Sequence, residues 1–243
     1  MENFFLIIIL ISVSGSLIGS LLGVIKKPSE KFLYNMMAFA GGVMLSISFL
    51  ELIPESIKLS NVWIAIAGII LGCFVMFVLD KLISHIHPGL LQPEKETMVK
   101  RTALYLMIGI ALHHFPEGMA IAIGTVSGAK TGIVMALVIA IHDIPEGICT
   151  SAPYFYITKK RLKAFLISTS TVIPTVLGFL VANQLYQQIS NNYVGLIIGV
   201  TAGLMIYITS DEIIPASCFK TTNHETIFSL VSGVLFVLLL NSI

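Results

Sequence analysis

The chain of 243 residues is 56% apolar and only 11% charged, and its mean hydropathy is +0.94. Ordinary soluble domains carry about 25% charged residues, so this composition excludes a soluble globular protein, a nucleic-acid-binding protein and a disordered chain. A membrane helix needs about 20 apolar residues, and the length allows eight such spans with short connections between them.

Eight apolar stretches follow one another, separated by short charged or turn-forming segments. They cover residues 4–25, 31–54, 61–86, 101–125, 130–157, 162–185, 193–217 and 224–243. The first is longer than the apolar part of a signal peptide and has no basic segment before it, so we expect a retained span. We therefore expect an all-α polytopic membrane protein, a bundle of eight transmembrane helices. We also expect residues 1–243 to form a single transmembrane domain, with a short loop at about 87–100.

The basic residues predict how the chain is oriented, because Lys and Arg concentrate in the cytoplasmic connections of membrane proteins. The connections after the first, third, fifth and seventh stretches hold twelve of the fourteen Lys and Arg residues, and the others hold two. We therefore expect both termini to be extracytoplasmic. The connections after the second, fourth and sixth stretches, which hold few basic residues, are expected on the same side. The loop at about 87–100 is expected in the cytoplasm. The expected location is the inner, cytoplasmic cell membrane, which the chain crosses many times.

Acidic residues have a different distribution, since about half of them fall inside the expected spans. These residues are Glu51, Glu117, Asp143, Glu146, Asp211 and Glu212. A carboxylate at the centre of a bilayer costs about 2.5–3.5 kcal/mol on insertion scales, and no Lys or Arg lies at comparable depth. A bound metal ion or protons must therefore offset the negative charge.

Two similar segments, His113–Gly118 (HHFPEG) and His142–Gly147 (HDIPEG), stand 29 residues apart. In each, the polar side chains occupy positions i, i+1 and i+4, which share one face of a helix that turns about 100° per residue. Both segments lie about midway through spans that run in opposite directions. Their imidazoles and carboxylates are therefore expected to converge on one small volume.

Imidazole and carboxylate ligands suit zinc, ferrous iron, manganese or cobalt, and the absence of a thiolate cluster disfavours a copper(I) pathway. Glu117 and Glu146 could each contact more than one ion. Three central carboxylates carry a charge of −3, so one divalent ion undercompensates them and two slightly overcompensate. The sequence therefore leaves a one-metal and a two-metal centre open.

The paired motifs are similar to the signature of the ZIP (Zrt/Irt-like protein) metal transporters, and the chain resembles their bacterial ZupT-type branch. Supporting stretches are residues 41–56 (GGVMLSISFLELIPES), 142–165 and 209–217 (TSDEIIPAS), and the resemblance covers essentially the whole chain. It implies an eight-helix bundle with extracytoplasmic termini. It also implies uptake of divalent metal through a site between the fourth and fifth helices, often in a homodimer.

The resemblance assigns roles to individual residues of this chain. His113, Glu117 and Glu146 match the primary metal site, and Met44 is a soft ligand from the second helix. His114 and Asp143 match a second site that the two glutamates bridge. The candidate metal ligands are thus Met44, His113, His114, Glu117, His142, Asp143 and Glu146, and the candidate pathway residues are Glu51, Asp211 and Glu212.

In the sixth helix the family usually has Glu before a Pro, where this chain has Ile173 before Pro174. That departure removes one carboxylate of the second site and leaves its occupancy open. Met44 could equally be a packing residue. Glycines recur at every fourth position of the first stretch, at Gly15, Gly19 and Gly23, and this spacing predicts close helix packing.

The expected function is import of zinc, with iron, manganese, cobalt and cadmium as further substrates. The expected partners are divalent metal ions and the lipid bilayer, with no nucleic acid and no permanent cofactor. Two alternatives remain. An intramembrane zinc-dependent hydrolase would use an HExxH helix, which the sequence lacks. A membrane metal sensor would bind the ion without transporting it.

Overall fold

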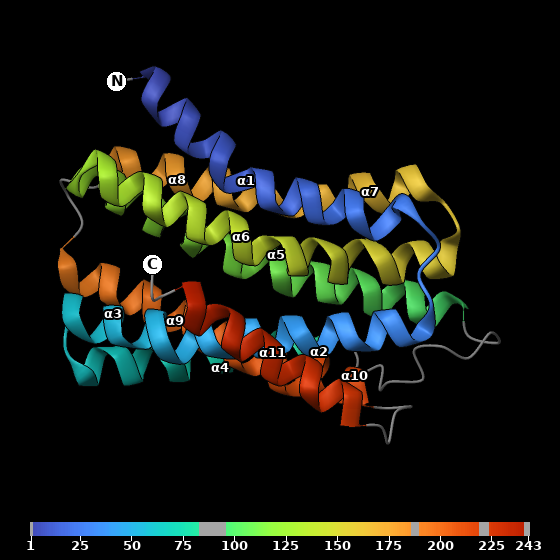
Figure 1. The fold of residues 1–243 in the computed structure, drawn as a ribbon. Coiled ribbons are helices and arrows are strands. Elements are labelled where there is room, and N and C mark those ends of the chain that lie inside the picture. Colours follow the sequence, from blue (N-terminus) through green and yellow to red (C-terminus); the bar gives the residue numbers. More distant parts are fainter. Residues whose placement is uncertain (1, 83–95, 186–189, 219–223, 241–243) are drawn as a thin grey trace.

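The computed structural model describes residues 2–82, 96–185, 190–218 and 224–240. Every secondary-structure element in these residues is a helix, which confirms the expected all-α class. The helices join into eight rods that follow the eight apolar stretches (Figure 1). Residues 83–95, which include most of the expected loop, lie outside the described residues. The next helix begins at Glu96, so the last part of that expected loop is helical.

Five rods of the described chain are single α-helices. They are α1 (Glu2–Ile25), α4 (Val62–Leu82), α5 (Glu96–Ser127), α6 (Ala129–Thr158) and α11 (His224–Leu240). α5 continues through Pro116, and α6 continues through Pro145 and Pro153. Each of the two repeated motifs therefore lies on one continuous helix.

The other three rods each contain a turn of a different helical type. They are α2 (Glu30–Ile47), η1 (Ser48–Leu52) and α3 (Ile53–Leu59); α7 (Arg161–Thr169), η3 (Ser170–Val172) and α8 (Ile173–Leu185); and α9 (Asn191–Ile208), η4 (Thr209–Ile213) and α10 (Ile214–Cys218). η1 and η4 are π-helical turns, and a proline follows each of them, Pro54 in α3 and Pro215 in α10. A proline ring clashes with the carbonyl four residues earlier, and the wider π-turn relieves that clash.

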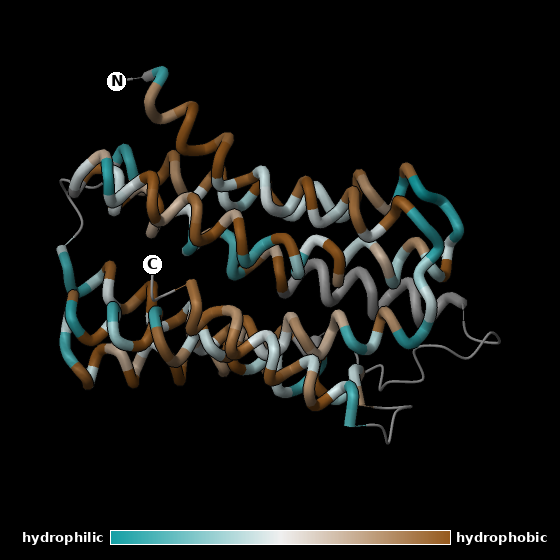
Figure 2. Tube along the Cα trace, viewed as in Figure 1, coloured by the Kyte–Doolittle hydropathy of each residue, from teal (hydrophilic) through white to brown (hydrophobic). Residues whose placement is uncertain are grey.

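Within the described residues, six helical rods are long and apolar enough to cross a membrane. α11 is apolar but shorter, with 17 residues described. Large apolar side chains cover the outside, as at Trp63 and Leu162, which are 77% and 70% exposed. Figure 2 shows hydrophobic residues along the rods and hydrophilic residues mainly at the helix ends. Such a surface suits a lipid environment, and the protein is an all-helical membrane protein.

The rods form two groups that lie side by side (Figure 1). One group contains α1, α5, α6, α7 and α8, in which α1 packs on α6 and α5 packs on both α6 and α8. The other contains α2, α3, α4, α9, α10 and α11, in which α4 packs on α9 and α2 packs on α11. The groups meet where α2 contacts α6 and α5 contacts α9.

Close contact between α1 and α6 depends on glycine. A Cβ atom added at Gly15 would overlap the carbonyl oxygen of Ala140, and one added at Gly19 would overlap that of Ile144. Both obstacles are backbone atoms of α6, which cannot move aside as a flexible side chain can. The packing role predicted for these glycines is therefore confirmed.

Candidate metal centre

The two motifs face each other across the contact between α5 and α6. α5 supplies His113, His114 and Glu117, and α6 supplies His142, Asp143 and Glu146. All six side chains are buried, with at most 4% of their surface exposed. The convergence expected from their spacing is confirmed.

The first histidine of each motif contacts the glutamate of the other. His113 Nε2 lies 3.0 Å from Glu146 Oε2, and His142 Nε2 lies 3.2 Å from Glu117 Oε1. This reciprocal arrangement follows from the repeated motif, because antiparallel helices place position i of one motif opposite position i+4 of the other. Each glutamate is thereby held at the interface between the two helices.

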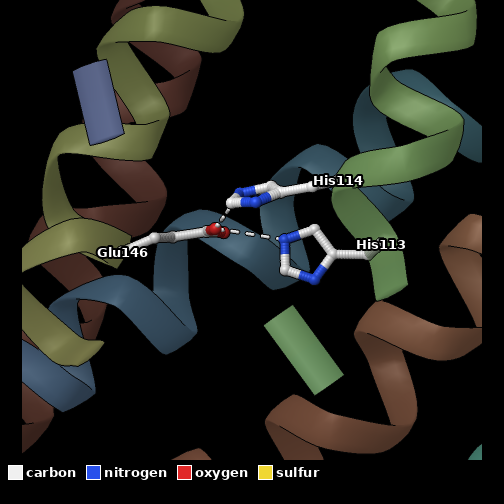
Figure 3. A group of neighbouring side chains, drawn as sticks. All are labelled: His113, His114 and Glu146. Atoms are coloured by element: carbon white, nitrogen blue, oxygen red, sulfur yellow. Dashed lines mark hydrogen bonds and ion pairs between the residues drawn. The ribbon is translucent and has the colours of Figure 1, made fainter. Parts of the chain in front are cut away.

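A first group of ligand atoms comes from His113, His114 and Glu146, and Figure 3 shows both imidazoles directed from α5 toward the carboxylate on α6. His114 Nε2 is 3.3 Å from Glu146 Oε2. The three ligand atoms lie within 4.8 Å of one another. A tetrahedral zinc ion with ligands at about 2.0–2.2 Å separates neighbouring donor atoms by about 3.4 Å. This group therefore has the size of a zinc site.

A second group shares His114 and adds Glu117 and Asp143. His114 Nε2 lies 3.7 Å from Asp143 Oδ1 and 3.9 Å from Glu117 Oε2. Asp143 Oδ1 also lies 3.3 Å from His142 Nε2. The two groups are thus contiguous, and His114 belongs to both.

The second ring nitrogen of His114 has a hydrogen-bond partner that the sequence did not indicate. Its Nδ1–H donates a hydrogen bond to the backbone carbonyl of Thr171 in η3, with an N···O distance of 2.8 Å. The proton on Nδ1 leaves the lone pair on Nε2, the atom that faces the carboxylates. Metal-binding histidines commonly have such an orienting partner on the second ring nitrogen.

The charge of the centre favours a cation. Three carboxylates are buried together, and no Lys or Arg is among the buried side chains of the described residues. Buried carboxylates are costly unless they are paired or bind a metal ion. Here the three imidazoles are their neighbours, and imidazole is itself a metal ligand.

A cavity of about 170 Å³ extends from the centre toward α3. Glu117 and His142 line it together with Glu51, Glu55 and Thr201. A water molecule occupies about 10–15 Å³ on this measure, so the cavity has room for several water molecules or a hydrated ion. It lies between the two groups of helices and places Glu51 beside the same space as the centre.

The remaining candidate residues belong to other helices, α2 and η4. Met44 is fully buried in an apolar cluster with Ile110 and Cys149, and its sulfur accepts a hydrogen bond from the hydroxyl of Thr209 at 3.7 Å. Asp211 and Glu212 lie in η4, where Asp211 is exposed and Glu212 is half-buried.

Ile173 stands at the position where the resemblance led us to expect a carboxylate. The side chain of Ile173 is 56% exposed on the outer surface, so a carboxylate there would not face the centre. The backbone of η3, just before it, contacts the centre instead through the carbonyl of Thr171.

An all-helical membrane fold with a buried centre of imidazoles and carboxylates defines a membrane protein that can bind divalent metal ions. A family model described as "ZIP Zinc transporter" matches residues 92–241. Similar proteins called "Zinc transporter ZupT" come from Streptococcus mutans, with 34% identity covering 90% of this chain and 89% of the relative, and from Chlorobaculum parvum, with 35% identity and the same coverage. The relative from Salmonella arizonae is 32% identical, covering 94% of this chain and 92% of its own length.

The chain therefore belongs to the ZIP family. The family is described by transport rather than by an enzymatic reaction, and the hydrolase alternative is not favoured.

Proposed function

We propose that this protein carries divalent metal ions, zinc above all, across the cell membrane into the cytoplasm. The observation that carries this proposal is the centre itself, with three carboxylates and three imidazoles on two antiparallel helices and no buried Lys or Arg in the described residues. Transport requires a site that binds the ion and also releases it. Mixed imidazole and carboxylate ligands meet that need, and the ZupT relatives are zinc transporters by name.

We propose that the centre binds two ions. The first is bound by His113 and Glu146, with Glu117 and His142 close by. The second is bound by His114 and Asp143, and the two glutamates bridge the ions. Support comes from the two contiguous groups of ligand atoms, which share His114. Met44 joins the first ion as a soft ligand when its sulfur leaves Thr209.

The proposed path runs from the α3 end to the α10 end of the molecule. In this proposal all eight rods cross the cytoplasmic membrane, with both termini and α3 outside, and the distribution of Lys and Arg supports that orientation. α1 begins and α11 ends toward the same end of the molecule as α3 (Figure 1), as an even number of crossings requires. The ion passes Glu51 in the cavity, reaches the centre, and leaves toward Asp211 and Glu212.

The direct test is zinc uptake by liposomes that contain the purified protein and a zinc-sensitive dye in their lumen. We expect uptake that saturates with zinc concentration and exceeds that of protein-free liposomes. Manganese, iron, cobalt and cadmium, added as competitors, would rank the substrates. Zinc binding without uptake would contradict transport and favour the metal sensor.

Glu51→Gln is expected to raise the KM for zinc uptake about threefold to tenfold and to leave the maximal rate within about twofold of wild type. A carboxylate in a cavity raises the local concentration of cations, and Glu51 is not one of the six residues that make up the centre. Initial rates over a range of zinc concentrations measure the effect. Glu225→Gln is the matched control, because Glu225 is exposed and paired with Lys31 at 2.8 Å. Equal KM values for wild type and Glu51→Gln would exclude Glu51 from the path.

A further inference from the structure

Ser16 in α1 contacts the metal centre although α1 supplies none of the ligands. Its hydroxyl donates a hydrogen bond to Asp143 Oδ2 at 3.0 Å, and both side chains are about 1% exposed. Among the neighbouring serines of α1, Ser12 and Ser14 donate to carbonyl oxygens of their own helix, those of Ile9 and Ile11. Ser20 shares a hydrogen bond with the neutral hydroxyl of Ser168 in α7. Bonding within the helix is the usual arrangement for a serine in a membrane helix. Ser16 therefore stands out by bonding to a charged group of another helix.

The packing of α1 on α6 is what brings Ser16 within reach. Gly15 and Gly19 lie against the carbonyls of Ala140 and Ile144, which are on either side of Asp143 in the sequence. α6 has a glycine of its own at this contact: a Cβ atom added at Gly147 would lie 2.7 Å from the backbone oxygen of Ser16. The backbones of α1 and α6 thus touch over the turns that carry Ser16 and Asp143.

The two oxygens of the Asp143 carboxylate have different partners. Oδ2 accepts from Ser16, whereas Oδ1 faces the ligand nitrogens, at 3.3 Å from His142 Nε2 and 3.7 Å from His114 Nε2. We infer that Ser16 is a positioning residue that fixes this carboxylate so that it offers one oxygen, Oδ1, to a divalent cation. The inference rests on the proposed function, because it assumes that Asp143 binds the transported ion.

Replacing a group that orients a metal ligand typically costs about tenfold to hundredfold in affinity or activity. Ser16→Ala is therefore expected to weaken zinc binding at the site containing Asp143 by about tenfold. Equilibrium zinc binding to the purified protein measures this loss, and the visible absorption of bound cobalt reports the change in ligand geometry. Ser12→Ala is the matched control, since Ser12 is 2% exposed on the same helix and does not contact Asp143.

Two further variants separate positioning from packing. Ser16→Cys keeps nearly the same volume but has only a weak donor, so it should lose affinity as Ser16→Ala does. In an Asp143→Ala background, adding Ser16→Ala should change zinc binding at the remaining ligands by less than about twofold, as a double-mutant cycle requires of a residue that acts through its partner.

The outcomes distinguish this inference from the proposed function. If the wild-type protein carries zinc and Ser16→Ala behaves like Ser12→Ala, the positioning role is wrong and transport stands. The role is equally wrong if the Ser16→Ala loss persists in full without Asp143, or if Ser16→Cys binds as wild type does. If the wild-type protein neither binds nor carries metal ions, the proposed function fails and the inference fails with it.

Discussion

Zinc uptake is expected to fall to the level of protein-free liposomes when Glu146 is replaced by Ala. One oxygen of Glu146 lies 3.0 Å from His113 Nε2 and 3.3 Å from His114 Nε2, so the substitution removes the only carboxylate of the first ligand group. Loss of an orienting residue alone costs about tenfold to hundredfold, and loss of a ligand should cost more than about hundredfold. Initial rates of zinc uptake at saturating and subsaturating concentrations measure the effect.

Glu146→Gln tests whether the charge or the volume matters, because the amide has nearly the same shape. We expect the same loss of uptake, since an amide does not neutralise a cation. Glu225→Ala, on the exposed surface of α11, should retain wild-type uptake. Both centre variants should elute as monodisperse protein, which excludes misfolding as the cause. Uptake within twofold of wild type in Glu146→Ala would remove Glu146 from the site.

The sequence predicted the rods well because hydropathy is a local property of the chain. Apolar stretches separated by charged turns define where a helix can cross a bilayer, and the described rods follow all eight of them. The six residues of the centre were also predictable, because the spacing i, i+1 and i+4 fixes a shared helical face. The contact between two helices could be predicted only for α5 and α6, because these two carry the repeated motif.

Contacts between distant elements were not predictable. Ser16 is one of several serines in an apolar stretch, and only the packing of α1 on α6 distinguishes it from Ser12 and Ser14. The partner of His114 is the backbone carbonyl of Thr171, and every residue type has such a carbonyl. No residue pattern could have indicated either contact.

The exposed position of Ile173 has a local geometric explanation. η3 is a 3₁₀ turn immediately before Ile173, and such a turn rotates about 120° per residue rather than about 100°. Over its three residues the helix face shifts by about 60°. That rotation contributes to the outward orientation of Ile173, while the carbonyl of Thr171 faces the centre.

The largest effect on stability is expected from Gly19→Ala. The added Cβ would overlap the carbonyl oxygen of Ile144, and the next nearest atoms are also backbone atoms of α6, so α1 must move away. Overpacking of this kind costs about 1–3 kcal/mol, which lowers the melting temperature of a protein of this size by about 2–12 °C. Thermal unfolding of the detergent-purified protein measures the shift.

Because Ser16 lies less than one helical turn from Gly19, the same displacement should weaken its hydrogen bond to Asp143. Zinc affinity is therefore expected to fall together with the melting temperature. Gly128→Ala is the matched control, since the nearest atom to its added Cβ is Thr131 Oγ1 at 3.8 Å. That variant should melt and bind zinc as wild type does. Equal melting temperatures for Gly19→Ala and Gly128→Ala would mean that α1 does not need its close contact with α6.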